Sequence, residues 1–326
     1  MFVEAPLTGS WDIWENKQCI KEAMSSPSIT AIIITKNEEL MVANCIETLR
    51  WCTEILVVDS DSQDQTAEIA ERLGAKVVTT HAQSFADRRN IALEHIKTDW
   101  VFYIDADERV TPQLAKEILV QIETTTASAL EMHRQNMMYG KFFLNGGWGK
   151  EFVQRIFRKQ ALAGWKGEIH ESPIFEGEIV RLHTSLFHLT HRNTIDGLYK
   201  TAMWTPLEAK LLFEANTPPV TGWTLLRKTV MEFFRRAILW SGRKDGMEGL
   251  IEAGIQAMNR FLVYVQLWEL QQQPSLTEKY HTKEMEFMKM WKKTSLSELS
   301  PVFKSEDADQ ETPTPKQEVP EKTEDE

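Results

Sequence analysis

The chain has 326 residues, 42% of them hydrophobic and 26% charged, enough to bury a sizeable core in one large or two modest domains. Its formal net charge is −11, but residues 305–326 hold nine Asp or Glu against two Lys, a net −7, which leaves −4 for the remainder. A mildly acidic folded part argues against nucleic acid as a partner.

The three cysteines, Cys19, Cys45 and Cys52, have no metal-ligand spacing and no even number to pair. This pattern predicts reduced thiols in a reducing compartment. No stretch has the pattern of a signal peptide, and no apolar run approaches the roughly 20 residues of a membrane span. We therefore expect a cytoplasmic protein.

The start of the chain, residues 1–28, ends in the turn-rich sequence SSPS, which predicts an N-terminal extension before the first strand. Four short apolar runs then predict strands at 29–35, 54–60, 75–80 and 99–105. The segments between these runs have helical spacing. Such alternation predicts an α/β fold with a mainly parallel central sheet and helices on both faces.

The second half of the chain changes character. Thr111 and Pro112 predict the start of a further helix, after which residues 128–190 become strand-like and glycine-rich. From 194 the pattern is helical. The expected organisation is an N-terminal extension at 1–28, a main α/β domain at 29–193, a helical region at 194–300 and a disordered acidic tail at 301–326.

Polar side chains follow three of the predicted strands, in TKNEE (35–39), DSDSQDQT (59–66) and DADER (105–109). In an open parallel sheet, ligands bind beyond the carboxyl ends of the strands. No glycine-rich phosphate loop follows the first strand, so a bound phosphate needs a metal or an arginine. Asp105 and Asp107 supply two hard oxygen ligands for Mg²⁺ or Mn²⁺. An ordinary turn or a helix cap is the alternative interpretation.

Five ordered motifs carry a more specific resemblance: ITAIIITKNEE, EILVVDSDSQDQTAEIAERLGAKV, RRNIALEHIKTDWVFYIDADERV, GGWGKEFVQRIFR and IHE. They occur in the order seen in glycosyltransferase family 2, and the chain resembles the branch with lipopolysaccharide-core β-1,4-glucosyltransferases. The similarity covers roughly residues 29–270. It implies a GT-A fold, a nucleotide-diphosphate sugar donor, Mg²⁺ or Mn²⁺, and a single displacement that inverts the anomeric centre.

The resemblance also implies roles by position. It places Thr35, Asn37, Glu38 and Asp59 in the nucleoside pocket, Arg89 and Asn90 at the family's Arg-Asn pair, Asp105 and Asp107 at the metal and donor, and Arg155 near the diphosphate. The chain departs from the family at Asp61 and Gln65, which replace glycines, and at Glu151, which replaces an Asp.

A direct displacement needs a general base for the proton of the acceptor hydroxyl. Glu171 and Glu151 are the two candidates, and we favour Glu171 because the IHE motif also offers His170 as a metal or substrate contact. The non-catalytic alternatives are a solvent-facing charge for Glu151 and a structural histidine for His170. Trp148 and Trp165, each beside a glycine, suit either stacking on a sugar or a place in the core.

Residues 222–246 mix aromatic and aliphatic side chains with six basic and two acidic ones. A helix of this composition either lies on an anionic membrane surface, where a lipid-anchored acceptor is found, or packs on the main domain with a solvated basic face.

The resemblance implies an inverting, metal-dependent hexosyltransferase that moves glucose from UDP-glucose to a sugar of the lipopolysaccharide inner core, and both the donor and the acceptor are inferred from the branch. We expect it in the cytoplasm, either free or peripheral on the inner face of the membrane. A transferase acting on another envelope glycan or on a protein is the first alternative. A sugar nucleotidyltransferase would need a glycine-rich, basic first loop that TKNEE lacks. A non-catalytic sugar-nucleotide-binding protein is the third.

Overall fold

The computed structural model describes residues 27–82, 84–167 and 171–294. The predicted N-terminal extension, apart from its last two residues, together with His170 and the acidic tail, lies outside the described residues. The chain up to Leu267 forms one compact unit, and the chain from Trp268 onward forms a second. The predicted boundary between residues 193 and 194 stays a prediction.

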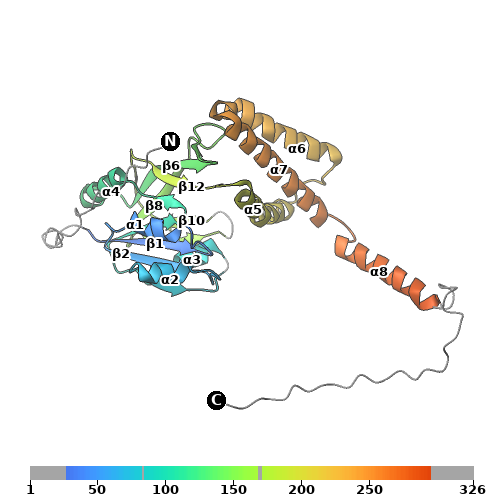
Figure 1. The fold of residues 1–326 in the computed structure, drawn as a ribbon, viewed down its shortest axis with the longest axis horizontal. Coiled ribbons are helices and arrows are strands. Elements are labelled where there is room, and N and C mark those ends of the chain that lie inside the picture. Colours follow the sequence, from blue (N-terminus) through green and yellow to red (C-terminus); the bar gives the residue numbers. More distant parts are fainter. Residues whose placement is uncertain (1–26, 83, 168–170, 295–326) are drawn as a thin grey trace, which may run out of the picture. The chain divides into compact units, whose positions relative to one another are not determined.

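The predicted alternation of strands and helices is confirmed in the first part of the chain (Figure 1). It runs through β1 (Ile29–Thr35), α1 (Val42–Glu47), β2 (Glu54–Asp59), α2 (Thr66–Arg72), β3 (Lys76–Thr79), α3 (Phe85–Glu94), β4 (Trp100–Asp105), β5 (Glu108–Arg109) and α4 (Pro112–Thr124). Thr111 caps α4 by accepting a hydrogen bond from the Leu114 amide, as its position before Pro112 predicts.

The strand-like middle of the chain is also confirmed. It forms β6 (Ala129–Met138), β7 (Lys141–Phe142), β8 (Phe152–Arg158), β9 (Leu162–Lys166), β10 (Ser172–Phe175), β11 (Ile179–Arg181) and β12 (Leu186–Leu189). The main sheet has the order β3-β2-β1-β4-β8-β6-β12-β5, with β7 and β11 also paired to β6. Strands β9 and β10 form a separate hairpin.

The pairing register brings the polar strand ends together. Strands β1, β2, β3 and β4 are parallel, and Thr35 pairs with Asp59 while Ile34 pairs with Asp105. Strand β8 runs antiparallel to β4, with Phe102 opposite Ile156, so Arg155 lies near the carboxyl end of β4. One edge of the sheet therefore collects residues from four different strands.

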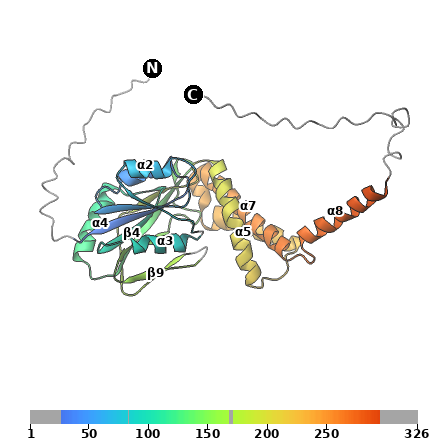
Figure 2. The same cartoon turned by 90° about the horizontal axis from the view of Figure 1, so that it is seen from below.

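Side-chain alternation along the strands builds two cores. Ala31 and Ile33 of β1 pack on one face with α1, α2 and α4, whereas Ile32 and Ile34 pack on the other with α3 and the β9–β10 hairpin (Figure 2). Both faces of the central strands are covered, which explains why these strands read as continuous apolar runs.

The helical region contains α5 (Thr194–Glu214), α6 (Gly222–Phe234), a π-helical segment η2 (Arg235–Leu239), a 3-10 turn η3 (Gly242–Asp245), α7 (Gly246–Leu270) and, in the second unit, α8 (Leu276–Lys293). Helices α5, α6 and α7 share a small core around Ala209, Leu225 and Tyr264. Among the described residues, no helix combines the length and apolar character that crossing a bilayer requires.

The prediction of one helix over 222–246 is wrong, because the chain reverses within it. Ser241 has a left-handed backbone with φ 58°. At Gly242, an added Cβ would lie 2.7 Å from the Arg236 carbonyl oxygen and 3.3 Å from the Gly146 Cα. The helix ends where the backbone at Gly242 contacts the backbone at Gly146. Helical periodicity cannot predict this contact, because the two residues are distant in the sequence.

Asp245 ties this reversal to the main domain. Its buried carboxylate accepts hydrogen bonds from the Asn145 backbone amide (2.8 Å), the Asn145 side-chain amide (2.8 Å) and the Leu144 backbone amide (3.4 Å). The start of α7 is thereby joined to the loop between β7 and β8.

Replacing this carboxylate should destabilise the protein. We expect Asp245→Ala to lower the free energy of unfolding by about 2–4 kcal/mol, because it leaves buried donors unpaired. Urea unfolding followed by circular dichroism measures the change. Asp245→Asn should lose less, and Glu123→Ala, on the exposed face of α4, should stay within about 0.5 kcal/mol of the parent. Equal stability of Asp245→Ala and Glu123→Ala would refute the anchoring role.

Candidate active site

The loops after β1 and β2 bond to each other through the residues predicted for a nucleoside pocket. The Thr35 hydroxyl donates to Asp59 Oδ1 at 2.9 Å, and Asp59 also accepts from the Ser62 hydroxyl (2.6 Å) and amide (2.9 Å). Asn37 Oδ1 accepts from the Gln63 amide at 2.8 Å. The structure therefore brings Thr35, Asn37 and Asp59 together at one edge of the sheet.

The two replaced glycines behave differently. Asp61 has a left-handed backbone with φ 54°, a conformation that suits glycine and that aspartate tolerates better than most residues. Gln65 precedes α2 with an ordinary φ of −83°. The Asp61 position thus keeps a glycine-like backbone, at which the side chain lies 2.7 Å from His81 Nδ1.

A buried ion network shapes the end of β4. Arg155 Nη2 lies 2.5 Å from Asp105 Oδ2 and 2.7 Å from Glu108 Oε1. Glu108 is fully buried, and its Oε2 accepts the Asp105 backbone amide at 2.9 Å. Arg134 Nη1 lies 3.4 Å from Glu108 Oε1. Glu108, whose role the sequence leaves open, holds the Asp105-Ala106-Asp107 turn in place.

Arg89 extends the network from α3. Its Nη2 lies 3.0 Å from Glu171 Oε1 and 3.6 Å from Asp105 Oδ1, and its guanidinium stacks 4.5 Å above the Trp165 ring. Asn90 donates to the Trp165 carbonyl and accepts from the Trp165 amide. Trp165 is therefore a buried support for Arg89, and Glu171 joins the Asp105 cluster.

The charges in this network bias protonation. Burial alone would raise the pKa of Asp105, but Arg155, Arg89 and Arg134 outweigh it and hold that pKa far below its usual range. Burial alone would lower the pKa of Arg155, but Asp105 and Glu108 raise it above its usual value. Asp105 is thus ionised at every physiological pH.

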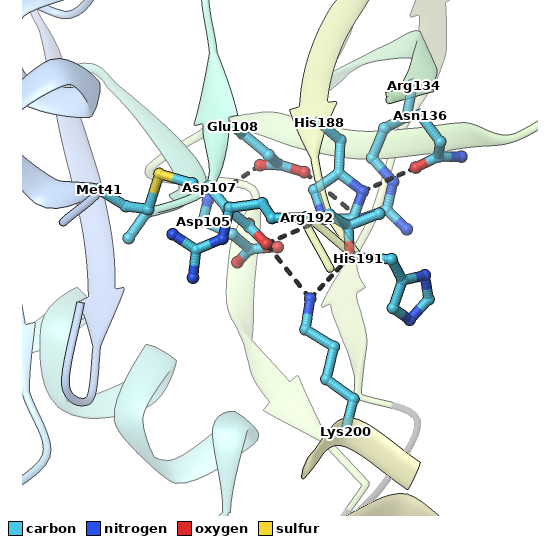
Figure 3. A network of polar contacts seen from close by, with 12 residues as sticks. Met41, Asp105, Asp107, Glu108, Arg134, Asn136, His188, His191, Arg192 and Lys200 are labelled. Carbon is cyan, nitrogen blue, oxygen red and sulfur yellow. Dashed lines mark hydrogen bonds and ion pairs between the residues drawn. The ribbon is translucent and has the colours of Figure 1, made fainter. Parts of the chain in front are cut away.

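Asp107 faces a second set of nitrogen groups, contributed by the chain after β11 (Figure 3). Its Oδ2 lies 3.3 Å from His188 Nε2 and 3.5 Å from Lys200 Nζ. Strand β12 delivers His188, because it pairs with β5 on one side and β6 on the other, with His188 opposite both Glu108 and Asn136. Lys200 comes from α5.

Glu151 lies on the far side of His188. Its Oε1 is 2.5 Å from Arg134 Nη2, and its Oε2 accepts from the Asn136 amide at 2.8 Å. Asn136 Oδ1 in turn lies 2.7 Å from His188 Nδ1. Burial opposes ionisation of Glu151, yet Arg134 and Asn136 lower its pKa below the usual value. Glu151 is therefore a hydrogen-bonded member of a partly buried network, with 31% of its side chain exposed.

The donors at this site fit a divalent cation bound together with a substrate phosphate. Within the described ranges, no three His, Cys, Asp or Glu side chains converge as a metal site. Asp107 and the imidazole of His188 supply two donors of suitable chemistry, and Mg²⁺ commonly takes one or two carboxylates plus phosphate oxygens. Burial, Lys200 and His188 lower the pKa of the nearby His191 to about 4, so His191 is a neutral imidazole. The role predicted for His170 stays a prediction.

Several residues of the site escaped the sequence interpretation, namely Arg134, Asn136, His188, His191 and Lys200. The histidines in LFHLTHRN were the available signal, since imidazoles at a strand end are unusual among apolar neighbours. Pairing of β12 with β5 and β6 across the sheet decides their position, and no local pattern records that pairing.

Glu38, predicted for the nucleoside pocket, is an unusual carboxyl. Burial, followed by repulsion from Asp107, raises its pKa from 4.5 to about 7. Its backbone amide donates to the Thr66 hydroxyl at 2.8 Å, which fixes the residue between the first two loops. Glu38 therefore changes charge near neutral pH, beside Asp107.

This titration predicts a pH dependence of stability. A carboxyl whose folded pKa is raised stabilises the fold fully below its unfolded pKa, near 4.5, and loses that contribution as pH rises to about 7. As pH rises from 4.5 to 8, the parent should lose free energy of unfolding that Glu38→Gln does not lose. The difference in free energy of unfolding should therefore shift in favour of Glu38→Gln by roughly 1–3 kcal/mol. Denaturant unfolding of ligand-free protein at both pH values measures this. Glu71→Gln, at an exposed position of α2, serves as control; parallel pH profiles for parent and Glu38→Gln would contradict the assignment.

Comparison with known proteins agrees with this geometry. Residues 30–171 match the family described as Glycosyl transferase family 2. An uncharacterized glycosyltransferase of Rickettsia conorii is 29% identical over 267 residues, covering 74% of this chain and 90% of the relative. The lipopolysaccharide core biosynthesis glycosyltransferase LpsC of Rhizobium meliloti is 27% identical over 256 residues, covering 74% and 92%.

Solved structures of glycosyltransferases also align with the chain. Glucosyl-3-phosphoglycerate synthase from Mycobacterium tuberculosis, in complex with Mn²⁺, UDP and glucosyl-3-phosphoglycerate, is 18% identical, with a TM-score of 0.41 over 67% of this chain and 88% of that one. The strand order and the family match confirm the GT-A-like α/β fold predicted from the sequence. The match and the similarity to glycosyltransferases over 74% of this chain support a transferase, and residues 30–171 match a glycosyl transferase family 2 domain.

Proposed function

We propose that this chain is an inverting, metal-dependent hexosyltransferase that moves glucose from UDP-glucose onto a sugar of a cell-envelope glycolipid such as the lipopolysaccharide inner core. The observation that carries the proposal is the turn after β4 in a family 2 domain, where Asp105 is held by arginines and Asp107 faces His188 and Lys200. The similarity to LpsC over most of both chains supports the acceptor class.

Donor binding is assigned to the edge formed by β1, β2 and β4. Thr35, Asn37, Glu38 and Asp59 are proposed to hold the nucleoside, since the loops that carry them are bonded to one another. Arg89 and Asn90 are proposed to position Glu171 and the β9–β10 hairpin beside it. Arg155 is proposed to act on the diphosphate through Asp105, with which it is paired.

Asp107 and His188 are the residues that would hold Mg²⁺ or Mn²⁺, with Asp105 as the predicted further contact. When bound, the metal supplies positive charge that stabilises the departing diphosphate. The buried arginines fix Asp105 in its ionised form, and the His188–Asn136 hydrogen bond orients the imidazole toward Asp107. The chain thus presents oriented donors before any ligand arrives.

The chemical step is a single displacement. The acceptor hydroxyl oxygen attacks the anomeric carbon while the bond from that carbon to the diphosphate oxygen breaks, and the bonding pair stays on the diphosphate. The hydroxyl proton passes to a carboxylate base. We favour Glu171, which Arg89 orients at 3.0 Å, because both oxygens of Glu151 already accept hydrogen bonds.

The donor assignment is tested with UDP-glucose and other nucleotide sugars in the presence of Mg²⁺ or Mn²⁺. The parent protein should bind UDP-glucose and hydrolyse it slowly, and Asp107→Asn should reduce turnover by at least about 100-fold, because an amide is a poor ligand and carries no charge. Glu123→Gln, at an exposed position of α4, is the control. Absence of nucleotide-sugar binding, with no effect of Asp107→Asn, would sink the proposal.

The base assignment is tested with Glu171→Gln. We expect donor binding within about threefold of the parent but transfer reduced by about 10²–10⁴-fold, the usual contribution of general base catalysis. Calorimetry with UDP measures binding, and release of UDP in the presence of acceptor measures transfer. Glu151→Gln is the comparison, and full activity of Glu171→Gln would assign the base to Glu151.

The acceptor class leads us to place the enzyme in the cytoplasm, peripheral on the inner face of the membrane. Helix α6 exposes Trp223 (69%), Leu226 (58%) and Val230 (55%). Arg227, Arg243 and Lys244 are exposed nearby, whereas Arg235 and Arg236 pair with the buried Glu232. Apolar side chains flanked by free cations suit an anionic lipid surface.

Vesicle co-sedimentation tests this contact. Binding should be stronger to vesicles that contain phosphatidylglycerol than to phosphatidylcholine alone, and it should weaken with salt. The double variant Trp223→Ser/Leu226→Ser should lose at least about fivefold in affinity, whereas Val120→Ser, at an exposed apolar position of α4, should not. Binding that ignores anionic lipid would rule out the membrane contact.

A further inference from the structure

Lys200 reaches the site from outside the segment that matches family 2. It lies in the second turn of α5, a helix whose first turn is fixed by Asn193, which caps the Asp196 amide at 2.9 Å. Its ammonium donates to the Thr190 hydroxyl at 2.7 Å and lies 3.5 Å from Asp107 Oδ2. Figure 3 shows the side chain extended toward Asp107.

The surroundings make this ammonium more than a surface charge. Asp107 is 19% exposed and Lys200 is 41% exposed, so the carboxylate is mostly covered while part of the lysine side chain faces solvent. Thr190 is buried and holds the ammonium beside the site. Glu38 and Arg192 are the neighbouring charges, and both Lys200 and Arg192 act on the Glu38 carboxyl.

We propose that Lys200 occupies the cation position of Asp107 in the donor-free protein and moves to the donor diphosphate when Asp107 takes up a divalent cation. The inference rests on the proposed function and adds a diphosphate-binding residue to it. Two cations cannot share one carboxylate oxygen without repulsion, so Lys200 must leave Asp107 oxygen Oδ2 when a metal binds there. Its flexible four-carbon stem and three donors allow it to exchange one oxygen for another.

The exchange has a consequence for the chemical step. As the bond from the anomeric carbon to the diphosphate oxygen breaks, the electron pair stays on that oxygen and negative charge grows there. Lys200 remains an ammonium throughout and stabilises this charge, while the acceptor proton goes to the carboxylate base. In the absence of donor, the Lys200 ammonium offsets the negative charge of Asp107. Without it, the Asp107 carboxylate would repel the nearby Glu38 carboxyl and would have no cationic partner from α5.

The test is Lys200→Met, which keeps the length of the side chain and removes the charge. Mn²⁺ alone is titrated and followed by electron paramagnetic resonance, and UDP is titrated calorimetrically at saturating Mn²⁺. We expect Mn²⁺ to bind roughly threefold to tenfold tighter, because its competitor is gone, and UDP to bind about tenfold or more weakly. A merely structural role of Lys200 would weaken both.

Two variants control the experiment. Lys210→Met removes an exposed lysine of the same helix that pairs with Glu214 at 3.7 Å, and it should leave both affinities unchanged. Lys200→Arg keeps the charge and should restore most of the UDP affinity. Equal Mn²⁺ affinity of the parent and Lys200→Met would overturn the proposed exchange. A lack of Mn²⁺ binding by both proteins would overturn it as well. Failure of the parent protein to bind UDP at all would instead overturn the proposed function.

Discussion

Arg155 Nη2 lies within 2.7 Å of carboxylate oxygens of both Asp105 and Glu108, and the side chains of Arg155 and Glu108 are buried whereas that of Asp105 is 32% exposed. Buried ion pairs repay their desolvation only when further hydrogen bonds satisfy the remaining groups. Here Glu108 also accepts the Asp105 backbone amide and faces Arg134. The Arg155–Glu108 ion pair and the Glu108 hydrogen bond to the Asp105 amide therefore fix the conformation of the turn after β4. This conformation determines where the side chains of Asp105 and Asp107 point.

The position of the nitrogen groups that face Asp107 depends on this turn as well. Because Glu108 belongs to β5, it fixes the strand against which β12 pairs, with His188 directly opposite. The Leu189 amide donates to the Asp107 carbonyl at 2.8 Å. Strand β12 leads into α5, so one short strand carries both His188 and the route to Lys200. The catalytic function we propose thus needs the helical half of the chain, in addition to the family 2 domain.

The proposed membrane face is joined to the same centre through the loop before Glu151. The Gly146 amide donates to the Trp240 carbonyl at 2.8 Å, and Arg236 donates to the Gly146 carbonyl at 3.1 Å. At Gly147, with φ 96°, an added Cβ would lie 2.7 Å from the Trp240 ring. Gly147 of the GGWG motif is required by this close contact, which joins the segment after α6 to the loop that leads into Glu151.

The sequence by itself determined the four central strands, their alternation with helices and the acidic turn after β4. These features rest on local signals, namely apolar periodicity, caps and turn residues, which act over a few residues. Tertiary structure alone decided that Glu108 is an internal anchor, that Glu151 lies in a partly buried network and that Lys200 meets Asp107 across 93 positions. Strand pairing and helix packing create such contacts between distant residues, and their free energy comes from burial and charge that no short window of sequence contains.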